Sequence, residues 1–184
     1  MMPAKINSTS TIYKGKIFHL VSENITLPNG NTTHMDIIRH PGASAIIPMA
    51  DNHTVILLKQ YRHATGSNIW EIPAGTLEKN ETPGACAKRE LIEETGYSAT
   101  QWQNIGKIIP VPGYSDETIH IFLASHLLPA QQNLDTNEII DVHKIKLSTA
   151  LKMIYNGEIN DGKTVSGLLL AAHYLKQSTF SKHN

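Results

Sequence analysis

Cysteine is nearly absent from this sequence, since Cys86 is the only one among 184 residues. A single cysteine excludes an intrachain disulfide and is compatible with a reducing compartment. We therefore expect a cytoplasmic protein. Cys86 itself is expected to pack as a small residue on a helix rather than to act as a catalytic thiol.

An excess of basic charge is also missing, because 16 Lys and Arg residues balance 16 Asp and Glu residues. No broad basic surface for nucleic acid is implied, so any contact with a nucleotide should come from a local pocket. No apolar run approaches the length of a membrane span, and Met1 to Lys16 lacks the apolar centre of a signal peptide. We expect neither a nucleic-acid partner nor a membrane partner.

Zinc-binding patterns are missing as well. The ten histidines include no His-x-x-x-His or His-x-x-Glu-His spacing, which argues against a zinc site. What is present is an ordinary globular composition, 40% hydrophobic and 17% charged. The length suits one domain with a small appendage.

One stretch, Gly75 to Tyr97, concentrates acidic residues on a short helix and reads GTLEKNETPGACAKRELIEETGY. Thr82 is expected to cap the start of this helix, and Pro83 suits its first turn. Gly96 is expected to end it in the left-handed conformation.

Three carboxylates, those of Glu90, Glu93 and Glu94, lie at positions i, i+3 and i+4 and so share one face of this helix. Ala87 and Leu91 are expected to point the other way, toward a core. Like charges at this spacing destabilise an isolated helix by roughly 0.2–0.5 kcal/mol per pair, and the plain alternative is a solvated acidic face. A hard cation such as Mg²⁺, however, binds through carboxylate and carbonyl oxygens together with substrate phosphates. The stretch therefore predicts a metal–phosphate site.

The stretch resembles the Nudix box, which is a glycine, five residues, a glutamate, seven residues, Arg-Glu, an aliphatic residue, any residue, Glu-Glu, any residue, a glycine and an apolar residue. Every fixed position matches, and Tyr97 is a soft departure where an aliphatic residue is commonest. The resemblance implies the Nudix fold, an α/β (α+β) architecture with a mixed β-sheet in an α/β/α sandwich. Residues 1–40 are expected to form an N-terminal antiparallel β appendage for dimerisation and base recognition, and residues 41–184 the hydrolase domain.

Hydrophobic periodicity predicts the other elements. Residues 1–10 are expected to be loose, and Asn29-Gly30 to turn a hairpin. Strands are predicted over residues 11–27, 32–39, 43–49, 54–60, 70–73, 102–110, 119–127 and 139–147. Ser148 is expected to cap a helix that runs to Tyr155, and a last helix is predicted over residues 163–177.

Four further segments resemble the ADP-ribose pyrophosphatase branch of this family, namely residues 60–62, 70–75, 112–117 and 157–164. The resemblance implies Mg²⁺-dependent hydrolysis of ADP-ribose or a related nucleoside diphosphate sugar, with Mn²⁺ as a possible substitute. The products would be a nucleoside monophosphate and a sugar phosphate. GDP-mannose and other sugar nucleotides stay open as substrates. A nucleoside triphosphate hydrolase is a further alternative, which the N-terminal hairpin and the Pro112 loop argue against. A non-catalytic nucleotide-sensing module is a different class of function, which the four intact acids of the box argue against.

The resemblance also implies roles for residues of the box. Glu90 and Glu94 would be the main metal ligands, with the carbonyl of Ala74 as a backbone ligand. Glu93 would bind metal or position water, and Glu81 would support the site electrostatically. Arg89 is expected to orient these carboxylates through charge-assisted hydrogen bonds.

Outside the box the expected roles concern the base and the substrate. The general base is expected on a loop, with Glu138 favoured over Asp135 and Glu117. Arg62 is expected to contact a phosphate or the terminal ribose, and Arg39 the nucleobase or a phosphate. Tyr114 is expected on the sugar side. The substrate site is expected to include Arg39, Arg62, Glu71, Pro112, Tyr114 and Glu117, in a homodimer.

Overall fold

The computed structural model describes residues 2–180. The chain forms two compact units, each considered by itself. One unit comprises the chain up to Gly42 together with Ile109–Thr118, and the other comprises Ala43–Ile108 together with the chain from Ile119 onward. We call them the N-terminal unit and the main unit.

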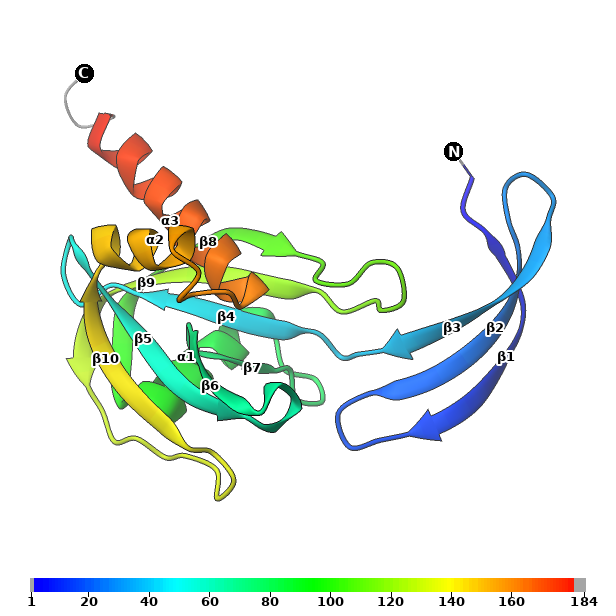
Figure 1. Ribbon diagram of the computed structural model, residues 1–184, viewed down its shortest axis with the longest axis horizontal. Helices are drawn as coiled ribbons and strands as arrows, with labels where there is room; N and C mark the ends of the chain where they lie inside the picture. Colours follow the sequence, from blue (N-terminus) through cyan, green and yellow to red (C-terminus); the bar gives the residue numbers. More distant parts are fainter. Residues whose placement is uncertain (1, 181–184) are drawn as a thin grey trace. The chain divides into compact units, whose positions relative to one another are not determined.

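The N-terminal unit contains an antiparallel sheet in the order β1-β2-β3 (Figure 1). Its strands are β1 (Lys5–Lys14), β2 (His19–Thr26) and β3 (Thr32–Arg39). The predicted Asn-Gly hairpin is confirmed, with Gly30 at φ 86° and its N–H donating to the carbonyl of Leu27. The expectation of a loose N-terminus is wrong for Lys5 onward, because that segment pairs with β2 as far as Thr26.

The main unit holds the remaining strands and all the helices of the described chain. The strands are β4 (Ala43–Pro48), β5 (Thr54–Arg62), β6 (Ser67–Glu71), β7 (Ala74–Thr76), β8 (Tyr97–Ile108), β9 (Ile119–Pro129) and β10 (Ile140–Lys146). The helices are α1 (Pro83–Thr95), α2 (Leu147–Tyr155) and α3 (Gly162–Phe180), with a short 3₁₀ turn, η1 (His63–Thr65). One sheet has the order β7-β4-β9-β8, with β4 and β9 parallel, and another has the order β10-β5-β6.

Strand β4 is buried along its whole length, and its alternate side chains enter two separate cores. Ala45 and Ile47 pack in a cluster that includes residues of α2 and α3, whereas Ile46 packs with Ala87 and Leu91 of α1. Helices α1 and α3 therefore cover opposite faces of this sheet, as Figure 1 shows. The predicted arrangement, a mixed sheet between two layers of helices, is confirmed. The continuous apolar run of this strand follows from burial on both faces.

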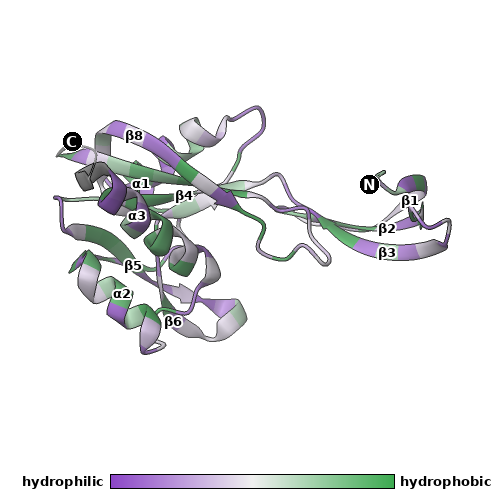
Figure 2. Ribbon diagram, turned by 90° about the horizontal axis from the view of Figure 1, so that it is seen from above, coloured by the Kyte–Doolittle hydropathy of each residue, from purple (hydrophilic) through white to green (hydrophobic). Residues whose placement is uncertain are grey.

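Hydropathy differs between elements of the two units (Figure 2). Strand β5 and parts of α3 are hydrophobic, whereas most of β3 is hydrophilic. Of the helices in the described part of the chain, none is both long and apolar enough to cross a membrane.

Several predicted boundaries differ from the structure, and two of the differences have clear local reasons. Strand β8 begins at Tyr97 rather than Trp102, because Tyr97 pairs with Pro129 directly after the turn at Gly96. Helix α2 begins at Leu147, so Ser148 lies inside it and does not cap it. The N–H of Leu147 instead donates to the carbonyl of His53 (2.7 Å), which satisfies this group without a side-chain cap.

Candidate active site

Helix α1 is bounded as its sequence predicts. The N–H of Ala85 donates to Oγ1 of Thr82 (3.3 Å), and Pro83 is the first helical residue. Gly96 ends the helix at φ 71°, where its N–H donates to the carbonyl of Ile92. These caps fix where the helix starts and stops, and so fix which of its side chains face the sheet.

The acidic face of α1 is not a solvated face. Glu90 is 9% exposed and Glu94 is 2% exposed. Ala87 and Leu91 of the same helix are fully buried, so α1 is covered on more than one side. The prediction that Ala87 and Leu91 point toward a core is confirmed, and Glu90 and Glu94 are buried outside that apolar cluster. Glu93 is the most open of the three acids. Buried carboxylates need compensation by hydrogen bonds or cations.

The backbone of strand β7 packs against Glu90 and Glu94 and buries their carboxylates. The N–H of Ala74 donates to Oε2 of Glu94 (2.8 Å). A Cβ at Gly75 would lie 1.8 Å from Oε1 of Glu90, so only glycine leaves room for that carboxylate. The Ala74-Gly75 dipeptide therefore lies directly against the acids, as expected of a backbone that lines the site.

Arg89 pairs with the other acids of the box. Its Nε and Nη2 reach the two oxygens of Glu81 (both 2.9 Å), while Nη1 contacts Glu90 (2.6 Å) and Glu93 (2.9 Å). The hydrogen bonds from Arg89 lower the pKa of Glu81 to about 2. One guanidinium thus holds three carboxylates in fixed orientations, because its donors form a rigid fork.

Burial raises the pKa of Glu94 well above its ordinary value, and the charge of Glu90 adds to this effect. Burial likewise raises the pKa of Glu90, although the hydrogen bond from Arg89 opposes the shift. Two carboxylates that lose hydration and repel each other would be stabilised by a further cation close to them.

The donor chemistry here suits a hard divalent metal ion. The acids turn toward Arg89 and Ala74, so among the described residues no three metal-binding side chains converge on one point. The buried oxygens of Glu90 and Glu94 and the neighbouring backbone nevertheless match the ligands that Mg²⁺ and Ca²⁺ take. The nearby Sγ of Cys86 is directed to the carbonyls of Gly75 (3.4 Å) and Thr76 (3.7 Å). Small rotations of the long glutamate side chains would bring their oxygens together around a bound ion.

A second cluster lies on β5, β6 and the start of α3. Arg62 donates from Nε to Oε2 of Glu71 (2.7 Å) and from Nη2 to Oε1 (3.2 Å). Lys163 contacts the same Oε1 and also Oδ2 of Asp161 (3.1 Å). Sequence reasoning proposed Arg62 and Glu71 but gave Asp161 and Lys163 no role. The only signal was their place in the segment 157–164.

Glu138 and Arg62 lie on one cavity of about 520 Å³, which residues 60–63 and 136–139 line. After burial and the charge of Glu90, Glu138 further raises the pKa of Glu94, whereas the charge of Arg62 lowers it. Glu138 also accepts a hydrogen bond from the N–H of Asp135 (2.9 Å). The main unit therefore brings Arg62, Glu138 and the buried acids of α1 within electrostatic reach of one another.

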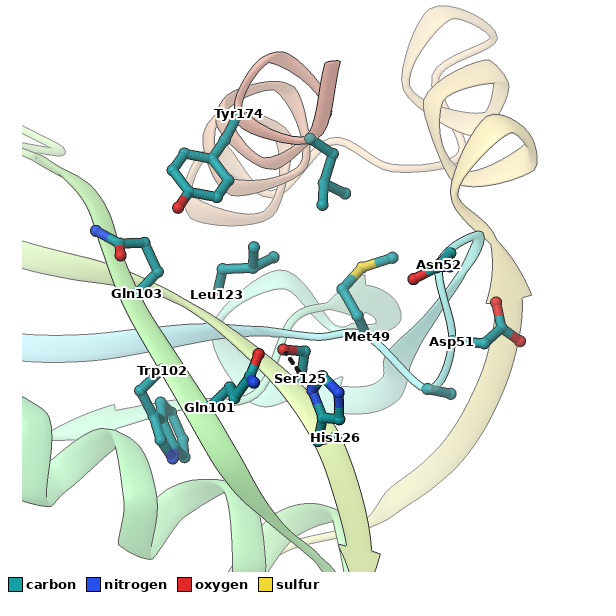
Figure 3. Close-up of a pocket in the computed structure, with 12 residues that line it drawn as sticks. Met49, Asp51, Asn52, Gln101, Trp102, Gln103, Leu123, Ser125, His126 and Tyr174 are labelled. Carbon is teal, nitrogen blue, oxygen red and sulfur yellow. Dashed lines mark hydrogen bonds between the residues drawn. The ribbon is translucent and has the colours of Figure 1, made fainter. Parts of the chain in front are cut away.

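A larger cavity of about 690 Å³ lies elsewhere, between β8, β9, the turn after β4, and α3 (Figure 3). Figure 3 shows Gln101, Gln103, His126 and Tyr174 around it. It contains none of the predicted site residues. The larger of these two cavities is therefore not the one that the predicted residues Arg62 and Glu138 line.

The remaining predicted residues belong to the N-terminal unit. Arg39 pairs with Glu23 (2.6 Å) and with Asp116 (3.0 Å). The loop that carries Pro112, Tyr114 and Glu117 is tied to β3, where the N–H of Ile38 donates to the carbonyl of Tyr114 (2.8 Å). Pro112 and Tyr114 are exposed and Glu117 is partly exposed. The sequence missed both acidic partners of Arg39.

Comparison with known proteins identifies the family. The family described as the NUDIX domain matches residues 38–166, so the chain belongs to the Nudix family. It is a pyrophosphohydrolase, and Nudix hydrolases generally need a divalent metal ion.

Several relatives extend over most of the chain. An ADP-ribose pyrophosphatase of Bacillus subtilis (strain 168) is 41% identical over 83% of this chain and 84% of its own. A methanol dehydrogenase activator of Bacillus methanolicus is 38% identical over 97% and 96%. A GDP-mannose pyrophosphatase of Citrobacter koseri is 34% identical over 89% of each. A solved structure titled as an ADP compounds hydrolase shares the fold with a TM-score of 0.84 at 23% identity, over 97% of each chain.

Proposed function

We propose that this chain is an Mg²⁺-dependent hydrolase of nucleoside diphosphate sugars with ADP-ribose as its preferred substrate. The observation that carries the proposal is the pair of buried carboxylates, Glu90 and Glu94, packed against Ala74-Gly75. Their burial disfavours the ionised state and is compensated when a divalent cation binds. ADP-ribose is favoured over GDP-mannose because the relative that acts on ADP-ribose is more similar to this chain, 41% against 34% identical.

The proposed reaction is attack by water on one phosphorus of the pyrophosphate. The water oxygen forms a new P–O bond as the bridging P–O bond breaks, and one proton of the water passes to a base. The products are AMP and ribose 5-phosphate when ADP-ribose is the substrate. Bound Mg²⁺, or Mn²⁺ in its place, would neutralise phosphate charge and lower the pKa of a coordinated water.

The chain's own residues would hold and orient the reactants. Glu90, Glu94 and the carbonyl of Ala74 would hold the metal. Glu93 would support it, while Glu81 would act through Arg89, which it pairs with on both oxygens. Fixing these groups before the substrate arrives avoids reorganisation during the reaction.

Arg62 and Glu138 would act on the substrate side. The guanidinium of Arg62 is held on one edge by Glu71, which leaves its other donors for a phosphate or the terminal ribose. Glu138 is the proposed general base, because it lies on the same cavity as Arg62 and its charge acts on both Glu90 and Glu94. A base must reach the proton it accepts within hydrogen-bond distance, directly or through one water.

We further propose that residues 1–40 serve dimerisation and base recognition in a cytoplasmic homodimer. Strand β1 is exposed along its whole length and forms an edge of its sheet, with Ile6, Ile12 and Tyr13 each more than half exposed. An exposed strand edge that also carries exposed apolar side chains favours association. Arg39, Pro112, Tyr114 and Glu117 would contribute the contacts with the nucleoside.

A substrate panel tests the proposal. The purified chain is incubated with Mg²⁺ and each of ADP-ribose, GDP-mannose, ADP-glucose, UDP-glucose and deoxynucleoside triphosphates, and the phosphate monoesters formed are measured with a coupled phosphatase. We expect the highest kcat/KM with ADP-ribose. A preference for GDP-mannose would change the substrate but keep the reaction. Turnover of triphosphates alone, or binding of ADP-ribose without any cleavage, would contradict the proposal.

A further inference from the structure

Glu71 lies at the centre of an ionic network that links three elements of the main unit. It is 2% exposed and accepts hydrogen bonds from Arg62 of β5 and from Lys163 of α3. A buried carboxylate of this kind is retained at a stability cost unless its partners compensate its charge. Because Arg62 is fixed by Glu71, whatever fixes Glu71 also sets the position of Arg62.

The first turn of α3 is built around the carboxylate of Asp161. Its Oδ2 accepts from the N–H of Thr164 (3.0 Å), from Oγ1 of Thr164 (2.5 Å) and from Nζ of Lys163 (3.1 Å). The side chain of Asp161 thus orients both Lys163 and Thr164. A cap alone would require only the bond to the backbone N–H.

Thr164 carries this order to the segment beside the acids. It is fully buried, and its Oγ1 accepts from the N–H of Ile72 (2.9 Å), a residue 92 positions away. The next residue, Pro73, accepts from the N–H of Ile46 (2.8 Å), and Ala74 donates to Glu94. The backbone from Ile72 to Ala74 is therefore held at each residue, and the bond to Thr164 is its anchor toward α3.

We propose that Asp161, Lys163 and Thr164 are positioning residues of the hydrolase site, holding Arg62 through Glu71 and the carbonyl of Ala74 through Ile72. The inference rests on the proposed function. It gives a role to three residues at the start of α3, which lie outside the box. Each acts through another residue and touches no reacting atom.

The charges in this network give Lys163 a separate effect. Arg62 and Lys163 balance Glu71 and Asp161, so the network is neutral. Loss of the Lys163 charge would leave one negative charge beside the group proposed to bind phosphate. That negative charge would repel an anionic substrate and weaken its binding. The repulsion decreases with distance and with screening by salt.

Paired variants of the full chain test the inference with ADP-ribose and Mg²⁺. Thr164→Val keeps the shape but removes the hydroxyl, and we expect it to lower kcat by about 10- to 100-fold, since small displacements of a catalytic group are costly. Thr164→Ser keeps the hydroxyl and is expected to retain most of the rate. Lys163→Met is expected to raise KM about tenfold, and Lys163→Arg to restore it. Ser166→Ala, on the same helix, is the control.

Thermal unfolding of each variant separates positioning from stability. If Thr164→Val and Lys163→Met lower Tm but the folded protein keeps the kcat and KM of the wild type, these residues are only structural and the inference is wrong. If the wild type cleaves no nucleoside diphosphate sugar, the proposed function fails and the inference fails with it. An active wild type with unaffected variants overturns the inference alone.

Discussion

Gly75→Ala is the substitution whose effect follows most directly from the structure. The φ of Gly75 lies outside the left-handed region, so alanine can adopt its backbone conformation. What alanine lacks is space, because its Cβ would lie 1.8 Å from Oε1 and 2.0 Å from Cδ of Glu90. Real Cβ contacts stay above 3.0 Å, so the carboxylate would have to retreat by roughly 1.2 Å.

A displacement of this size should affect catalysis more than folding. The atoms in conflict are the end of a long side chain, which can rotate, whereas a shift of about 1 Å in a catalytic group can cost about 100-fold in rate. We expect kcat to fall by about that factor, equivalent to roughly 2.7 kcal/mol in activation free energy. Tm should change by only a few degrees.

The assay is hydrolysis of ADP-ribose at saturating Mg²⁺, with thermal unfolding measured on the same preparations. Gly84→Ala is the matched control, because a Cβ at that position meets nothing within 4 Å and alanine favours a helix. Glu90→Asp retracts the same carboxylate by one methylene, so adding Gly75→Ala to it should cost less than the single change does in the wild type. Wild-type kcat in Gly75→Ala would refute the assignment of Glu90 to the reacting site.

Glu94→Gln should lower kcat by orders of magnitude while the protein stays folded, and activity equal to the wild type would sink the metal assignment. Burial raises the folded-state pKa of Glu94 above its ordinary 4.5. When a chelator keeps metal away, the free energy of unfolding of the wild type should therefore fall as pH rises through that folded-state pKa. The free energy of unfolding of Glu94→Gln should fall less over the same range. Adding Mg²⁺ at 100 times its Kd should stabilise the wild type by about 2.7 kcal/mol in urea unfolding, and an equal gain in Glu94→Gln would contradict binding at this acid. Arg89 lowers the pKa of Glu81 from 4.5 to about 2, so the stability lost in Glu81→Gln at pH 7 should shrink as pH falls from 4.5 toward 2, and a gap independent of pH would count against the ion pair.

The sequence predicted what short-range chemistry controls. The caps of α1 at Thr82 and Gly96 follow from residue type alone, and the apolar run of residues 43–49 predicted a strand that the structure shows to be buried along its length. The acids of the box were recognised from their spacing. Each of these patterns lies within one short segment of the sequence, and the longest of them is Gly75 to Tyr97.

What the sequence could not predict depends on distant partners. The pairing of Lys5 onward with β2 compensates a polar segment that has no periodicity of its own. The partner of Arg39 at Asp116 is 77 residues away, and that of Thr164 at Ile72 is 92 residues away. The burial of Glu90 arises because β7 covers it, which no helical pattern reveals.

The division of β4 between two cores has a consequence for how this protein can change over time. Ile46 is constrained by α1, which carries the acids of the box, whereas Ala45 and Ile47 are constrained by the opposite layer of helices. Substitutions in one layer therefore need compensation only within that layer. Neighbouring residues of this one strand are therefore subject to two different packing constraints, one set by the helix that carries the acids of the box and one set by the opposite layer.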